Sequence, residues 1–94
     1  MLLGLAHFRA VDGARKAVSG LDITVRWQLP LTKDSFAETT VTTGENGEAI
    51  VAIPPSHMPQ LPIEAEYKAG TAFGKVRVGG NSHTPITQIM VHAA

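Results

Sequence analysis

The chain has 94 residues, 44% of them hydrophobic and 17% charged, a composition typical of one folded domain over residues 1–94 and not of a disordered segment. Eight basic and eight acidic residues balance without any block of like charge, which argues against nucleic acid and membrane surfaces as partners. The absence of cysteine excludes disulfides and thiolate metal sites, and leaves the compartment undetermined. No segment approaches the roughly 20 apolar residues of a membrane-spanning helix, and residues 1–6 are too short for the apolar region of a signal peptide.

The first two predicted strands lie in the N-terminal third of the chain. Residues 2–9 form a mainly apolar run, which a turn at Asp12 and Gly13 follows. In residues 21–29 apolar and polar side chains alternate strictly, which is the pattern of a strand with one buried and one solvent-facing side. Trp27 lies on the apolar side of this strand, so we expect it to anchor the core rather than to form a sugar-binding platform.

The segment 38–53 predicts a hairpin around which the other strands are organised. Residues that favour strands flank the sequence Gly-Glu-Asn-Gly at positions 44–47, and an Asn-Gly pair in such a place is typical of a hairpin turn because both residues tolerate a positive φ. Residues 39–43 and 48–53 are the predicted arms. The second arm is apolar on both faces, which indicates that a neighbouring loop or a partner covers one of them.

Three further strands are predicted in the C-terminal half. Residues 63–68 and 72–78 each alternate and are joined by a short turn, and the last strand covers residues 86–92. Gly74, inside the second of these strands, predicts a bulge or a close approach to the backbone. No segment has a sustained helical period. The pattern predicts an all-β fold, a seven-stranded antiparallel β-sandwich of two sheets.

Three segments carry a resemblance to known families. They are residues 11–20, the strand that opens at residues 21–25, and residues 42–48, which lead into an apolar strand. This arrangement resembles the carboxypeptidase regulatory-like and transthyretin-like β-sandwiches and the related bacterial Ig-like repeats. The resemblance implies an accessory, interaction or spacer module and not a reaction.

One enzyme family shares the transthyretin-like fold class, the hydroxyisourate hydrolases. Their N-terminal strand carries a histidine followed by a turn, and the segment from His7 to Gly13 resembles this feature. The family's C-terminal Tyr-Arg-Gly-Ser motif is absent from this chain, and Arg26 stands in no matching motif, so no hydrolase site is carried over. A small hydrolase with its site at an oligomer interface stays as an alternative function.

Candidate catalytic and metal-binding residues form no pattern that predicts a site. The histidines have no spacing that places two of them on one rigid element, and the serines lack a nucleophile motif with an adjacent base. The sequence therefore predicts no catalytic residue, no metal ligand and no cofactor. A ligand- or carbohydrate-binding domain, the other alternative, would need exposed aromatic rings, whereas Phe36 and Tyr67 are expected to lie in apolar alternations.

The expected function is that of a non-catalytic interaction, accessory or spacer module, as a domain or small subunit of a larger assembly. If the strands alternate in direction, all 6 prolines fall in connections at one end of the sandwich, where fixed φ angles stiffen the loops and reduce the entropy lost on binding. We expect this end to dock a protein partner. The predicted docking residues are Ser56, His57, Met58, Pro59, Gln60, Leu61, Gly80, Asn81, Ser82, His83 and Thr84.

Overall fold

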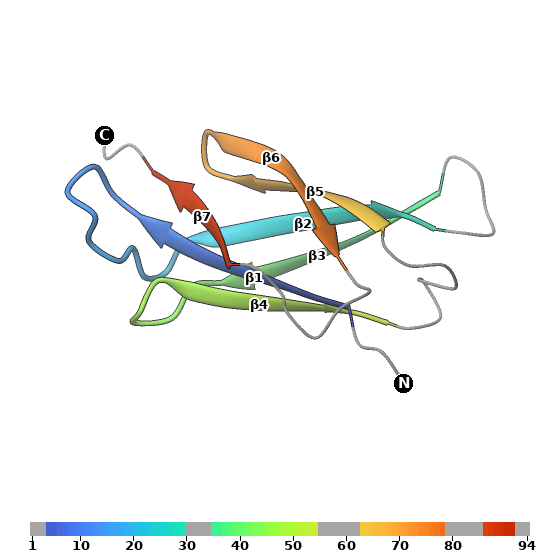
Figure 1. The fold of residues 1–94 in the computed structure, drawn as a ribbon, viewed down its shortest axis with the longest axis horizontal. Coiled ribbons are helices and arrows are strands. Elements are labelled where there is room, and N and C mark those ends of the chain that lie inside the picture. The colour runs from blue at the N-terminus through green and yellow to red at the C-terminus, as the bar shows by residue number, and fades with distance from the viewer. Residues whose placement is uncertain (1–3, 30–34, 55–62, 79–85, 92–94) are drawn as a thin grey trace.

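The computed structural model describes residues 4–29, 35–54, 63–78 and 86–91 of the chain. Its secondary structure within these ranges is entirely β (Figure 1), and they contain no helix that could cross a membrane. The strands are β1 (Gly4–Val11), β2 (Asp22–Gln28), β3 (Phe36–Thr42), β4 (Glu48–Ile53), β5 (Ile63–Ala69), β6 (Ala72–Val78) and β7 (Ile86–Met90).

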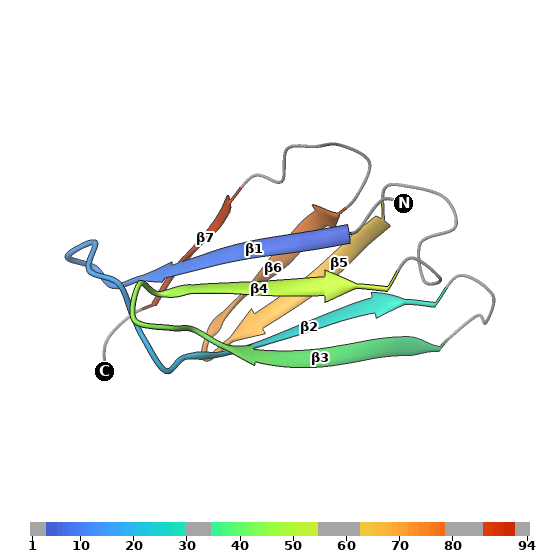
Figure 2. The ribbon, with the colours of Figure 1, turned by 90° about the horizontal axis from the view of Figure 1, so that it is seen from below.

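The strands form two sheets that face one another as a β-sandwich, which confirms the predicted fold class (Figure 2). One sheet has three strands in the order β4-β1-β7, and the other has four in the order β3-β2-β5-β6. Within the described part of the chain, every pair of neighbouring strands is antiparallel except β1 and β7. These two strands are parallel because both are odd-numbered in a chain whose strands alternate in direction.

The predicted central hairpin is wrong in its pairing, although its turn is correct. The turn closes as expected, with the Gly47 amide donating to the Gly44 carbonyl at 2.9 Å and the Gly44 amide donating to the Glu48 carbonyl at 3.0 Å. The strands on either side nevertheless belong to different sheets, since β3 pairs with β2 and β4 pairs with β1. Residues 43–47 therefore form an arch that carries the chain from one layer to the other.

Gly47 fits this arch against the neighbouring strand in a way that no other residue can. Its φ is +72°, a region that side chains other than glycine rarely adopt. The amide of Ala10 donates to the Gly47 carbonyl at 2.7 Å, so the turn is bonded to the end of β1. A Cβ atom at this position would lie 2.6 Å from the carbonyl oxygen of Ala10.

Thr43, on the other side of the arch, is a buried polar residue that ties the arch to the β1–β2 connection. Its hydroxyl donates to the Val18 carbonyl at 2.7 Å and accepts from the Leu21 amide at 2.9 Å. Its own amide donates to the Leu21 carbonyl at 2.9 Å, and its carbonyl accepts from the Gly20 amide at 2.9 Å. One buried side chain therefore satisfies two main-chain groups that would otherwise lack partners.

Thr43→Val is expected to lower the free energy of unfolding by about 1–3 kcal/mol, because it removes the hydroxyl and leaves the Leu21 amide and the Val18 carbonyl unpaired. Urea unfolding measures this change. Thr40→Val is the matched control, since Thr40 is exposed on the preceding strand β3 and its hydroxyl lies 3.1 Å from that of Thr24. Equal losses from the two variants would contradict this role of Thr43.

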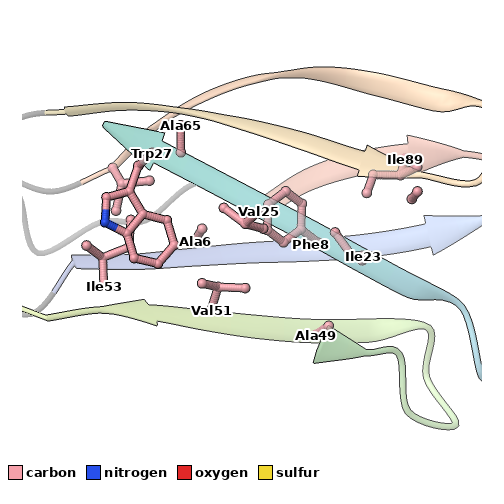
Figure 3. Packing of buried hydrophobic residues seen from close by; sticks show 12 residues of the cluster. Ala6, Phe8, Ile23, Val25, Trp27, Ala49, Val51, Ile53, Ala65 and Ile89 are labelled. Atoms are coloured by element: carbon pink, nitrogen blue, oxygen red, sulfur yellow. The ribbon is translucent and has the colours of Figure 1, made fainter. Parts of the chain in front are cut away.

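The core lies between the sheets and is built from the inward-facing residues of the alternating strands (Figure 3). Trp27 is 4% exposed, which confirms its predicted place in the core. Its ring lies near Ile53 of the opposite sheet, and Phe8 lies further along the sandwich beside Val25 (Figure 3). The core residues are Ala6, Phe8, Ile23, Val25, Trp27, Ala49, Val51, Ile53, Ala65, Ala69, Val78 and Ile89.

Gly74 allows a tyrosine to pack across β6. The register between β5 and β6 is continuous through Gly74, so there is no bulge, but a Cβ atom there would lie 2.6 Å from the hydroxyl oxygen of Tyr67. The Tyr67 ring meets Phe8 of the other sheet, with ring centroids 5.4 Å apart and the planes tilted by 58°. The close approach predicted at Gly74 is therefore confirmed, and the group that approaches is an aromatic ring that joins the two layers.

Candidate functional site

The predicted docking residues lie outside the described part of the chain, so that surface stays a prediction. The strand ends on either side of them are described. The end of β4, the start of β5 and the end of β6 lie at one end of the sandwich, whereas β7 starts beside the middle of β1, where Ile86 pairs with His7 (Figure 2). Of the prolines, Pro54 is described and is exposed at this end.

The outer face of the three-stranded sheet has an exposed apolar surface next to this end. His7 lies between Ile50 of β4 and Ile86 of β7 in one cross-strand row, and Leu5 pairs with Ala52 in the next. Ile50 is 55% exposed and Ile86 is 51% exposed. We call these five residues the outer patch. The prediction that β4 is apolar on both faces is confirmed, and nothing within the described residues covers its outer face.

The polar edge of the outer patch is formed by His7 and the next cross-strand row, in which Glu48 pairs with Arg9 and Arg9 with Gln88. The Nε2 atom of His7 lies 3.6 Å from Oε1 of Glu48. Nε2 is buried, and within the described residues it has no hydrogen-bond partner, since 3.6 Å is too long for a hydrogen bond. A protonated imidazole at this position would form an ion pair with Glu48.

The residues singled out for the hydrolase alternative do not meet within one chain. His7 faces outward from the three-stranded sheet, whereas Arg26 faces outward from the four-stranded sheet on the other side of the sandwich. Within the part of the chain that is described, no group of three or more histidine, aspartate or glutamate side chains could hold a metal ion. A site that uses both His7 and Arg26 would need a second chain.

The outer face of the four-stranded sheet has a groove that the sequence did not predict. Its volume is about 570 Å³, within the range of pockets that bind small molecules. Two neighbouring cross-strand rows form it. One row runs from Thr24 through Lys68 to Phe73, and the other runs through Glu38, Arg26, Glu66 and Lys75.

Two of the aromatic rings, those of Phe36 and Phe73, lie on this outer face, and only the position of Phe36 is contrary to expectation. Phe73 is 81% exposed, and Phe36, expected in an apolar alternation, is 48% exposed. The guanidinium of Arg26 lies over the Phe36 ring, 4.1 Å from its centroid, and Lys75 Nζ lies 3.5 Å from Glu64 Oε1. Phe73 alternates in phase with Lys75 and Arg77 of β6, and strand parity predicts its solvent-facing position.

The comparisons with known proteins do not add a family to this geometry. No family model, no curated protein and no solved structure matches the chain. The structure itself shows an all-β sandwich of two sheets. A fold alone does not identify a function, so the function is inferred from the two outer faces.

Proposed function

We propose that this protein is a non-catalytic β-sandwich module that binds a protein partner through the outer patch. The observation that carries the proposal is the pair of isoleucines, Ile50 and Ile86, each more than half exposed on either side of His7. Apolar side chains gathered on one face of a soluble domain mark interaction surfaces more often than isolated ones do. The expected partner therefore presents aliphatic side chains that pack on the outer patch. Polar groups around them would pair with Arg9 and Glu48.

The outer patch by itself is smaller than a stable interface between two proteins. The patch spans two cross-strand rows on three strands, a footprint on the order of 200 Å² from standard strand spacings. A stable interface between two proteins buries roughly 800 Å² on each side. The patch is thus part of a larger contact.

The strand order supports the transthyretin-like and carboxypeptidase regulatory-like resemblance over the Ig-like one. In an immunoglobulin constant domain the first, second, fourth and fifth strands share one sheet. Here β1 pairs with β4 and β7, while β2 belongs to the other sheet with β3 and β5. We infer membership of a transthyretin-like superfamily, in which this chain would act as an accessory module.

Ile50→Lys is expected to leave the free energy of unfolding within about 0.5 kcal/mol of its starting value, because the side chain is exposed, and to abolish partner binding. Urea unfolding of the isolated chain measures the first effect. For the second, a photo-crosslinking amino acid replaces Ile86 in cells that naturally produce the protein. One specific adduct is expected, and Ile50→Lys should remove it.

Met90→Lys is the matched control, because Met90 is 51% exposed on the same face and lies one cross-strand row beyond the polar edge of the outer patch. It should retain the adduct. The proposal fails if Ile50→Lys leaves the adduct unchanged or if position 86 forms none. An adduct of two copies of the chain, together with a dimer in analytical ultracentrifugation, would replace the external partner by self-association.

A further inference from the structure

The groove on the four-stranded sheet has the features of a site for a neutral ligand. Along one of its rows the charges alternate strand by strand, from Glu38 to Arg26 to Glu66 to Lys75. Carboxylates accept hydrogen bonds and the cationic groups donate them, so donors and acceptors alternate across the groove. Because the signs cancel, this row attracts neither anions nor cations as a class.

The other row adds an apolar platform at the edge of the sheet. The Phe73 ring is 81% exposed on β6 and pairs across strands with Lys68, whose neighbour on β2 is Thr24. A flat ring in this position can cover the C–H face of a saturated ring, and the polar groups beside it can bond to hydroxyls at that ring's rim. The combination matches a pyranose, which has an apolar face and hydroxyls around its edge.

The ion pairs of this face leave the polar groups of the groove available. Arg26 stacks on Phe36, and Lys75 lies near Glu64, which is outside the groove. No ion pair is recorded within the described residues for Glu38, Glu66 or Lys68. These three charged groups can therefore bind a ligand without first breaking an ion pair within the described part of the chain.

An extended peptide fits this groove less well than an oligosaccharide. Peptides that add to a sheet bond to the main chain of an edge strand. The groove instead crosses β2 and β5, which are interior strands paired on both sides. Recognition here must use side chains on the sheet face. The groove also extends across four strands, roughly 14 Å at the usual strand spacing, which suits a few linked sugar rings.

We propose that this groove binds a neutral oligosaccharide, with Phe73 stacked on one pyranose ring and Glu66, Lys68 and Arg26 bonded to hydroxyls. The site lies on the opposite side of the sandwich from the outer patch, so sugar binding and partner docking can occur together. The protein would thus present a bound glycan at one face while it is held in an assembly by the other.

The test is an NMR titration of the ¹⁵N-labelled full chain with maltohexaose, cellohexaose, xylohexaose and chitohexaose, each to millimolar concentration. At least one hexasaccharide is expected to shift the backbone amides of Lys68 and Phe73 in a saturable way. Phe73→Ala should weaken that binding about tenfold, the factor expected for loss of one aromatic contact. Glu66→Gln should weaken it as well, since it removes the charge from one acceptor.

Met90→Ala serves as the control, because it shortens an exposed apolar side chain on the opposite face outside the outer patch, and it should leave the affinity unchanged. Phe73→Ala and Glu66→Gln change exposed residues, so the amide spectra of these two variants should show a folded chain. The proposal is overturned if none of the four hexasaccharides shifts these amides, or if Phe73→Ala binds as well as the original chain. Shifts of the groove amides by inorganic phosphate or hexaglutamate instead would also overturn it, because they would indicate an anion site.

Discussion

Replacing Gly47 by valine is expected to lower the free energy of unfolding by about 2–6 kcal/mol. Two effects add. The residue has a φ of +72°, which costs a β-branched side chain about 1–3 kcal/mol. Its Cβ would also lie 2.6 Å from the main-chain oxygen of Ala10, and relieving such an overlap costs a similar amount. Since small domains have a total stability of roughly 5–15 kcal/mol, urea unfolding should show this loss clearly.

Alanine substitutions at Gly47 and Gly44 separate this explanation from a general intolerance of the turn. Both residues belong to the same arch, but a Cβ atom at Gly44 meets nothing closer than the Glu48 oxygen at 3.9 Å, and its φ is not positive. Gly47→Ala should be clearly destabilising and Gly44→Ala should not. If the two alanine variants lower the free energy of unfolding by the same amount, the contact with Ala10 is not the reason why position 47 is glycine.

Trp27→Ala is expected to lower the free energy of unfolding by about 3–5 kcal/mol, because the substitution empties a large volume in the core. The intact protein should show blue-shifted tryptophan fluorescence that iodide quenches poorly. Trp27→Phe keeps most of the volume and should cost less, so it remains measurable if the alanine variant does not fold.

The matched control for Trp27 is Phe73→Ala, an aromatic deletion in the same sheet on its outer face. It should change the free energy of unfolding by no more than about 0.5 kcal/mol. A red-shifted, readily quenched Trp27 together with a stable alanine variant would contradict the core assignment. It would also indicate that an exposed Trp27, and not Phe73, is the ring on which a sugar could stack.

The candidate sites were only partly visible in the sequence. The apolar outer face of β4 was predicted from Ile50 and Ala52, which alternate with three inward residues. The groove was not predicted, because it combines side chains from four strands whose order is set by pairing. Phe36 was assigned to an apolar alternation, whereas its neighbours in phase, Glu38 and Thr40, face solvent.

The sequence by itself determined the local features of this protein. The alternation in β2 predicted which side of the strand is buried, and the turn chemistry at Gly47 predicted a positive φ, because both depend on residues that are adjacent in the chain. The boundaries of β4 and β6 followed for the same reason, whereas β1 continues to Val11, beyond the predicted run 2–9, and β3 starts at Phe36, before the predicted arm 39–43. These features also predicted the fold class, since seven short strands with one apolar side each must bury that side between two layers.

Only the tertiary structure decided which strands are neighbours. The arms of the predicted hairpin separate because β3 and β4 each bury an apolar face toward the same core from opposite layers, β3 beside β2 and β4 beside β1. The bonds of Thr43 and Gly47 to residues far away in the chain hold this crossing in place. Such contacts have no signature in a short window of sequence, because backbone hydrogen bonds between strands are available to any partner and the shared core selects among them.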